Sequence, residues 1–292
     1  MSADVHSLAE ATDASVSAVC RALGMARSTV YAGRKRAPGA RARDTAKLDV
    51  EIAAIHKKSR GRYGSPRVHR ELRRQGRRVG RKRVEARMRQ QGLWGKRPRR
   101  FRRTTVRDPR QQPAPNVLAR RFGWELPNQA WVGDITYLLT HAGWVYLAIL
   151  VDLCTRAIVG WTTSTRCDGE LALACLNKAV GLQKPSPGLL VHHDQGSTYT
   201  AADYRKRLDE LSALPSMSRK GNCWDNAVAE STFATIKVEL FGDEIPTDLA
   251  EVNRALFEYI EIFYNRQRLH STLGYITPAE KEALANPASI AA

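Results

Sequence analysis

The sequence of 292 residues lacks several features that would place it in common protein classes. Its five cysteines are odd in number, scattered and never spaced as C-x-x-C, which argues against a disulfide framework or a cysteine zinc site. We therefore expect free thiols in a reducing cytoplasm. No apolar run approaches the roughly 18 residues of a membrane span, and no charged segment followed by an apolar one marks a secretory signal. We expect neither a membrane protein nor a secreted one.

Acidic residues are scarce in the amino-terminal part of the chain. Residues 1–123 hold 33 Lys and Arg against 9 Asp and Glu, whereas the remainder holds 14 against 20, and the net charge is +18. This distribution predicts a part that binds a polyanion and a separate, slightly acidic core. Nucleic acid is the polyanion that we expect, with binding that weakens steeply as salt rises. A ribosomal or membrane-surface protein would share the basic half.

The first 37 residues have the pattern of a helix-turn-helix unit. A short apolar helix is followed by Gly24 and by a second helical pattern. A generic helical hairpin is an equally good interpretation. If the unit binds DNA, its recognition helix presents Arg27, Ser28, Thr29 and Tyr31.

Residues 44–95 predict three helices with a second basic surface. Apolar residues recur at helical spacing, and the third helix is crowded with cations. Because like charges repel, such a surface predicts contact with DNA rather than solvent alone. The candidate contacts are Arg81, Lys82, Arg83 and Arg87.

Residues 96–122 are rich in Arg, Lys and Pro, a composition that does not form a core. We expect a basic linker that follows phosphates or enters a minor groove. A merely solubilising segment is the alternative. The candidate DNA contacts are Arg99, Arg100, Arg102 and Arg103.

Strands and helices alternate over residues 123–246, and a long helix over 247–267 begins the carboxy-terminal segment 247–292. Short turns between the first three strands predict an antiparallel meander. One late helix carries an apolar stripe from Ala229 to Leu240, with Asn222 and Asp225 as candidate starting residues. The expected strands are 129–139, 144–153, 156–162, 189–193 and 214–217, and the expected helices between them are 169–182 and 201–211.

Two acids stand in strand-like surroundings, where a carboxylate needs a partner. Asp134 interrupts an alternating strand, and Asp194 ends an apolar one. Glu230 follows Asp194 with 35 residues between them. Lys237 lies close to two helical turns after Glu230, so the side chains of Glu230 and Lys237 point to the same side of the helix. Magnesium ions take carboxylate oxygens, and two ions about 4 Å apart can clamp the reacting oxygens of phosphoryl transfer. A solvated charge pair on an ordinary helix is the alternative for Glu230 and Lys237.

Two further polar residues are candidates for ligand binding. Asp152 lies in a predicted strand, and with Arg156 close by we expect it to form a structural ion pair rather than to bind a ligand. His270 lies in the carboxy-terminal segment, where it is a ligand, a DNA contact or a packed side chain.

The set of Asp134, Asp194, Glu230 and Lys237 resembles the D,D(35)E constellation of retroviral integrases and related transposases. The sequence motifs around these residues point to a narrower family. From about residue 60 to 281 the chain resembles the second-frame (OrfB) transposase of the insertion-sequence-three family. His193 stands where this family more often has Ser. The motifs that carry the resemblance are WVGDITY at 131–137, HDQGS at 193–197, KGNCWDNA at 220–227 and YNRQRLHSTLGYITP at 264–278.

This resemblance implies an α/β fold: a ribonuclease-H-like mixed five-stranded sheet with flanking helices, preceded by an all-α helix-turn-helix DNA-binding region. The first and fourth strands would lie side by side, so that Asp134 meets Asp194, and the Glu230 helix would close the site. These three acids would be the catalytic residues and would hold two Mg²⁺, or Mn²⁺, ions. Lys237 would bind a DNA phosphate.

The implied activity is metal-dependent DNA cleavage and strand transfer at insertion-sequence ends. The implied partners are double-stranded DNA, from inverted repeats and target, a second copy of the chain in at least a dimer, and a first-frame OrfA protein. Such a protein belongs to the bacterial cytoplasm, associated with the nucleoid. Two alternatives stay open: a non-catalytic repressor or decayed transposase, and a ribonuclease-H-type nuclease, which the basic helix-turn-helix pair disfavours.

Overall fold

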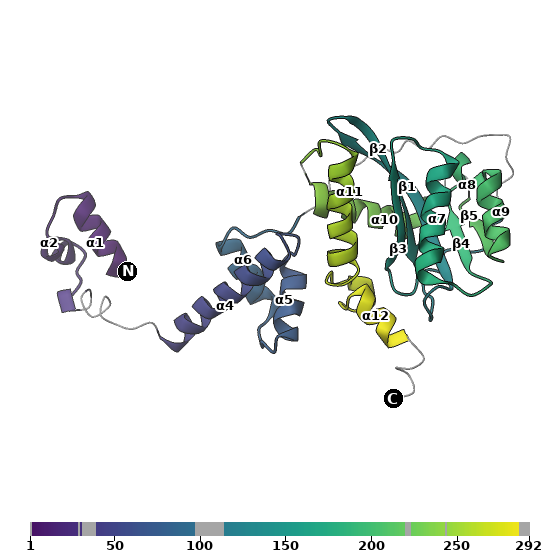
Figure 1. Cartoon of the computed structure of the whole chain (residues 1–292). Helices are drawn as coiled ribbons and strands as arrows, with labels where there is room; N and C mark the ends of the chain where they lie inside the picture. Colours follow the sequence, from purple (N-terminus) through teal and green to yellow (C-terminus); the bar gives the residue numbers. More distant parts are fainter. Residues whose placement is uncertain are drawn as a thin grey trace.

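The computed structural model describes residues 2–28, 30, 39–96, 114–219, 223–242 and 244–285. Along the chain they form a small helical unit, a second helical unit and a sheet covered by helices (Figure 1). No helix in these described stretches combines the length and the apolar character needed to cross a membrane.

The first helical unit contains α1 (Ser2–Ala11) and α2 (Val16–Ala22). The hydroxyl of Ser15 begins α2 by accepting a hydrogen bond from the Ala18 amide at 3.2 Å. A small apolar core holds the unit together, made of Val5, Ala9, Val19, Cys20 and Val30. Arg27, Ser28 and Val30 are helical, whereas the predicted contact Thr29 lies outside the described residues, as does Tyr31.

The second helical unit consists of α4 (Ala40–Lys58), α5 (Ser65–Arg74) and α6 (Arg81–Gln90). Its apolar side chains include Leu48, Ile52, Val68, Leu72 and Val84, all fully buried. They belong to the same hydrophobic cluster as Val132 of the sheet and Ile260 of the carboxy-terminal helices. The unit therefore packs against the rest of the protein through a continuous core.

The sheet has five strands in the order β3-β2-β1-β4-β5. β1 (Ala130–Thr140), β2 (Gly143–Asp152) and β3 (Ile158–Ser164) form an antiparallel meander. β4 (Leu190–His193) runs parallel to β1, and β5 (Leu214–Met217) runs parallel to β4. This mixed five-stranded sheet, with an all-helical region before it, confirms the predicted fold class.

Two layers of helices cover the sheet. α7 (Gly169–Gln183) and α9 (Ala202–Glu210) pack on one face, in a cluster with Trp131, and the four-residue α8 (Ser197–Thr200) lies beside them. The other face, which includes Val132 and Leu138, packs against α10 (Ala227–Ile236) and α11 (Leu249–Phe257). Side chains of β1 therefore alternate between two separate cores.

The carboxy-terminal helices are continuous over long stretches but not α-helical throughout. α10 follows a 3₁₀ turn (Cys223–Asn226) and runs on as a π-helix (Lys237–Phe241). α11 likewise continues as a π-helix (Glu258–Tyr264). Together α11 and this π-helix span most of the predicted helix over 247–267. A short 3₁₀ helix (Ser271–Leu273) and α12 (Pro278–Ala285) end the described chain.

Candidate active site between β1, β4 and α10

The parallel pairing of β1 with β4 places Asp134 beside Asp194. The last paired residues are Val132 and His192, and each acid lies two residues further along its own chain. Both carboxylates are half-buried and each accepts one local amide: Ile135 N donates to Asp134 Oδ1 at 2.8 Å, and Gly196 N donates to Asp194 Oδ1 at 2.9 Å. The register thus brings together two acids that are far apart in sequence.

Burial and like charge act together on this pair of carboxyls. Burial raises the pKa of Asp134 well above its ordinary value, the charge of Asp194 raises it further, and that of Glu230 adds to the effect. Burial also raises the pKa of Asp194. Two neighbouring carboxylates that resist ionisation need a cation if both are to carry charge.

Glu230 approaches this pair from α10. It lies in the first turn of that helix, is exposed, and is close enough for its charge to act on Asp134. The helix start is tied to β1 because Asn226 Nδ2 donates to the Gly133 carbonyl at 3.2 Å. Among the residues that the structure describes, no three His, Cys, Asp or Glu side chains are gathered closely enough to hold a metal ion. Glu230 therefore acts on Asp134 through its charge, but the three acids do not form a closed cage in the part of the chain described.

These donors nevertheless suit a hard divalent cation. Carboxylate oxygens are the ligands that Mg²⁺ prefers, usually one or two of them with water or phosphate in the remaining positions. The mutual repulsion of Asp134 and Asp194 supplies the electrostatic demand for such an ion. The residues present thus fit the metal that the sequence predicts.

Lys237 reaches back from the end of α10 to β1. Its Nζ donates to Thr136 Oγ1 at 2.7 Å and lies 5.0 Å from the ring centroid of Tyr137. Burial lowers the pKa of Lys237, and the charge of Asp134 partly opposes that change. Thr136 and Tyr137 were not predicted as site residues, and their place two and three residues after Asp134 was the available signal.

A buried aromatic group supports the acids from the α7 side. The His193 ring stacks on Tyr199 with centroids 3.9 Å apart, and the Tyr204 hydroxyl lies 2.6 Å from His193 Nε2. Burial lowers the pKa of His193 to about 3, so the imidazole is neutral at physiological pH. His193 therefore acts as a packed, uncharged support at the end of β4, directly before Asp194.

Asp225 holds the loop before α10 and does not cap the helix as the sequence suggested. Its buried carboxylate accepts hydrogen bonds from Arg219 at 2.9 Å, from Arg120 at 2.9 Å and from Asn116 at 2.8 Å. The guanidinium of Arg219 holds the pKa of Asp225 well below its usual range. Asn222, the other predicted starting residue, lies outside the described residues.

Asp152 is structural, but through a different contact from the one predicted. Its carboxylate accepts from the amides of Asn128, Cys154 and Thr155 at 2.7 to 3.0 Å. The Arg156 guanidinium turns instead to the Phe122 carbonyl, 2.9 Å away. The predicted ion pair between Asp152 and Arg156 is therefore replaced by an amide-lined turn.

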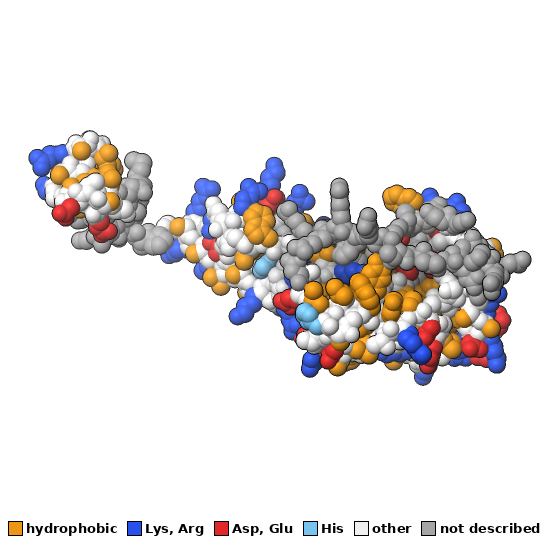
Figure 2. Space-filling model, turned by 90° about the horizontal axis from the view of Figure 1, so that it is seen from above, with side chains coloured by type: hydrophobic (Ala, Val, Ile, Leu, Met, Phe, Trp, Pro, Cys, Tyr) orange, Lys and Arg blue, Asp and Glu red, His pale blue; other side chains and the backbone are white. Residues whose placement is uncertain are grey.

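The predicted DNA contacts divide into four groups. Arg83 and Arg87 are engaged within the helical unit, by Asp44 at 2.8 Å and Asp49 at 2.7 Å. Arg81 and Lys82 are exposed. Figure 2 shows Lys and Arg side chains projecting from the second helical unit. Arg27 donates to Ser17 Oγ at 3.1 Å, and Ser28 is exposed beside it. Outside the described residues lie Thr29, Arg99, Arg100, Arg102 and Arg103.

Comparison with known proteins identifies the class of this chain. A family model described as an integrase core domain matches residues 125–223, a second integrase core model matches 212–278, and an HTH-like domain model matches 42–101. Among solved structures, the chain is similar to a simian T-cell lymphotropic virus intasome (TM-score 0.46, 18% identity, 79% of this chain and 74% of that one). It is also similar to the HTLV-2 integrase catalytic core in complex with magnesium (TM-score 0.42, 18% identity, 54% and 97%). Topology and matched models define the class: a polynucleotidyl transferase with an integrase core.

Curated relatives narrow this class. The transposase InsF of insertion sequence IS3A from Escherichia coli strain K12 is 39% identical over 270 residues, covering 92% of this chain and 94% of the relative. The transposase for IS904 of Lactococcus lactis is 40% identical over 235 residues, covering 80% and 93%. An uncharacterized 31 kDa protein of IS600 from Shigella sonnei is 40% identical over 261 residues, covering 89% and 96%. The chain belongs to the IS3 family of insertion-sequence transposases, as its sequence motifs predicted.

Proposed function

We propose that this transposase cuts DNA at the ends of its insertion sequence and joins the freed 3′ ends to another phosphodiester, with Asp134, Asp194 and Glu230 as its catalytic acids. The observation that carries the proposal is the register-fixed pair of Asp134 and Asp194, whose pKa values burial raises, with the charge of Glu230 acting on Asp134. The chemistry of this pair suits metal-assisted phosphoryl transfer.

The three carboxylates would hold two Mg²⁺ or Mn²⁺ ions, which would make a water or a 3′-hydroxyl more acidic and stabilise negative charge on a leaving oxygen. Asp134 and Asp194 would supply the fixed oxygens, since β1 and β4 set their spacing. Glu230 is the exposed member on a separate helix, so we propose that it completes the set when DNA is bound.

Lys237 would hold the phosphate next to the bond that breaks. Its ammonium group is a compact point charge, which suits a phosphate that shifts during reaction. The hydrogen bond to Thr136 holds it at a residue of β1 two positions after Asp134, on the same face of the strand. No nucleophilic side chain is needed in this scheme, so a water or a DNA hydroxyl attacks directly and no covalent protein–DNA intermediate forms.

We further propose a division of labour along the chain. Residues 1–37 and 44–95 would bind the inverted repeats, and the basic linker 96–122 would follow the DNA backbone. Residues 123–246 would form the catalytic core, supported by 247–292. Within the binding units, Arg27, Ser28, Arg81 and Lys82 are the described candidates for DNA contact.

Joining two ends of one element requires two active sites, so at least a dimer would assemble on DNA, near the nucleoid. A first-frame OrfA protein, or a frameshifted fusion to it, would add further end-binding surface. Footprinting on the flanking repeats and sizing of the DNA complex would test these partners.

The proposed chemistry is tested by joining of end oligonucleotides with Mg²⁺. Asp134→Asn, Asp194→Asn and Glu230→Gln should each abolish joining while leaving filter binding of end DNA nearly intact. Glu170→Gln, an exposed acid on α7, is the matched control and should join normally. Wild-type joining by any one of the three variants would refute the assignment. Shifts without nicks from the wild-type protein would favour a non-catalytic repressor instead.

A further inference from the structure

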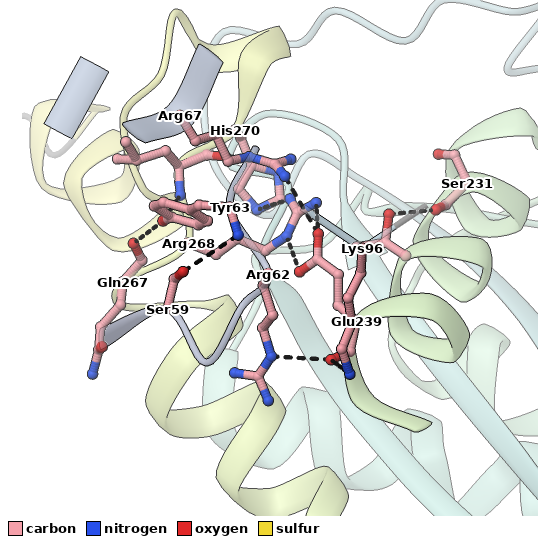
Figure 3. Close-up of polar contacts among 12 residues, drawn as sticks. Ser59, Arg62, Tyr63, Arg67, Lys96, Ser231, Glu239, Gln267, Arg268 and His270 are labelled. Carbon is pink, nitrogen blue, oxygen red and sulfur yellow. Dashed lines mark hydrogen bonds and ion pairs between the residues drawn. The ribbon is translucent and has the colours of Figure 1, made fainter. Parts of the chain in front are cut away.

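The carboxylate of Glu239 is buried where three parts of the chain meet (Figure 3). Glu239 lies on the π-helix that continues α10, two residues after Lys237. Arg268 donates to both of its oxygens, from Nη2 at 2.8 Å and from Nε at 2.9 Å, and the Tyr259 hydroxyl donates at 2.9 Å. A bidentate guanidinium of this kind fixes a carboxylate in direction as well as in position.

The second helical unit reaches the same residue. Arg67 of α5 lies with Nη1 3.4 Å from Glu239 Oε1. Arg62, in the loop before α5, donates from Nε to the Glu239 carbonyl at 3.0 Å, and Lys96 Nζ lies 3.4 Å from that carbonyl. The unit therefore holds Glu239 by its side chain and by its main chain.

The segment that supplies Arg268 is held by the same helical unit. The Tyr63 hydroxyl donates to the Gln267 carbonyl and accepts from the Leu269 amide, both at 3.0 Å. Arg67 Nε donates to the Leu269 carbonyl at 3.0 Å. Residues on both sides of Arg268 are thus fixed by Tyr63 and Arg67, so the docking of the helical unit sets where Arg268 stands.

Charge makes Glu239 the centre of this junction. One carboxylate faces the guanidiniums of Arg67 and Arg268, and Arg268 itself is almost fully buried. Burial alone would raise the pKa of Glu239, but the hydrogen bonds and charge of Arg268 outweigh it and keep the pKa below its ordinary value. Without Glu239, Arg268 would be a buried cation with its main counter-ion gone.

We propose that Glu239 is a positioning residue, which transmits the docking of the second helical unit to α10 and so sets the places of Glu230 and Lys237. The helix from Ala227 to Phe241 is continuous, so a displacement at Glu239 moves the catalytic acid and the phosphate-binding lysine with it. DNA held by the helical unit would act on the active site through this connection. The inference rests on the proposed function.

The test measures joining of pre-cleaved end oligonucleotides at saturating DNA across a range of Mg²⁺ concentrations. Glu239→Gln keeps the shape of the side chain and removes its charge. Because residues that orient metal ligands typically affect metal affinity or activity about 10- to 100-fold, the Mg²⁺ concentration for half-maximal joining should rise about tenfold. Filter binding of end DNA should stay within about twofold, since an interaction that only orients the acids adds little to DNA affinity.

Glu258→Gln is the matched control, because it removes an exposed ion pair with Arg60 that joins the helical unit to the carboxy-terminal helix and not to α10. Exposed pairs contribute little, so its Mg²⁺ requirement should equal that of the wild type. Equal Mg²⁺ requirements for Glu239→Gln and Glu258→Gln would overturn the inference.

Arg67→Met decides the matter if Glu239→Gln does not fold. This variant removes the contact of the helical unit with the Glu239 side chain and leaves the pair of Glu239 with Arg268 in place. It should also raise the Mg²⁺ requirement, and an unchanged requirement would overturn the inference. A wild-type protein that binds ends but joins nothing would overturn the proposed function, and this inference with it.

Discussion

His193 fills the space that a side chain at position 133 would need. A β carbon built on Gly133 would stand 2.5 Å from His193 Cε1, 2.6 Å from its Nδ1 and 2.8 Å from Leu150 Cδ2. Gly133 directly precedes Asp134, and His193 directly precedes Asp194. The imidazole therefore sets how closely the two acid-bearing strands pack.

Gly133→Ala should destabilise the protein by about 1–3 kcal/mol, the usual cost of overpacking a filled core. His193→Ser makes room, so the double variant should recover part of that loss, measured as a coupling energy in urea unfolding. Gly181→Ala is the control, since a β carbon there meets nothing within 4 Å and Ala favours a helix. Additive effects of the two substitutions would show that the strands are not packed in this way.

Asp134→Asn should stabilise the metal-free protein, because it removes one of two carboxylates that oppose each other's ionisation. We expect a gain on the order of 1 kcal/mol at pH 8, or about 2–4 °C in melting temperature for a protein of this size. The carboxyl pKa is raised on folding, so the penalty should be absent well below about pH 4, where both states are protonated, and should grow as pH rises above it.

Mg²⁺ provides the second half of this test. Added Mg²⁺ should raise the melting temperature of the wild type and not that of Asp134→Asn, because only a ligand of the folded state stabilises it. The exposed Asp203→Asn on α9 is the control and should respond as the wild type does. A lower melting temperature for Asp134→Asn without metal would contradict the expectation.

Asp225→Asn should loosen the loop that leads into α10. The substitution weakens the contacts to Arg219 and Arg120, but both guanidiniums are partly exposed and can be hydrated. We therefore expect a loss of about 1–3 kcal/mol, less than for a fully buried ion pair. Glu210→Gln, which removes an exposed pair with Arg207, should cost less than about 1 kcal/mol in the same denaturant titration. Equal losses would argue against an anchoring role.

His270 should make the protein sensitive to mild acid. It is a packed side chain, with Nε2 3.3 Å from Arg268 Nη1 and its ring edge-on to Tyr264. Burial lowers its pKa far below the ordinary 6.5, and the charges of Arg268, Arg67 and Arg156 lower it further. The unfolded state therefore binds the proton first, and the free energy of unfolding should fall as pH drops below about 6.5.

His270→Gln should flatten this profile by up to about 1.4 kcal/mol per pH unit, the limit for one titrating group. Urea titrations at several pH values between 7.5 and 5 would measure the slope. His141→Gln alters an exposed histidine, and its free energy of unfolding should depend on pH as that of the wild type does. An identical slope for His270→Gln and the wild type would assign the acid sensitivity elsewhere.

The strands were predictable because their alternation and turns are local properties. The first strand was predicted over 129–139 and is found at Ala130–Thr140, and the fourth was predicted over 189–193 and is found at Leu190–His193. The third was predicted to begin at 156 but begins at Ile158, because the Asp152 carboxylate gathers amides and prolongs the turn. A side chain that reorganises a turn is not visible in strand periodicity.

The junction around Glu239 could not be predicted in the same way. Arg67 and Glu239 are 172 positions apart, and only the packed core brings them together. Arg83 and Arg87 likewise looked like unpaired cations on their own helix, whereas their acids lie on α4. Pairings between elements depend on how helices pack, which charge patterns along one helix do not reveal.

The parallel pairing of β1 with β4 has a consequence for how this chain tolerates changes of length. Side chains alternate along a strand, so deleting one residue from within β4 would turn the following acid to the opposite side of the sheet. Extra residues in the connection at 184–188, between α7 and β4, would leave the pairing untouched. Insertions should therefore accumulate between the strands and be absent from the few positions at which they pair.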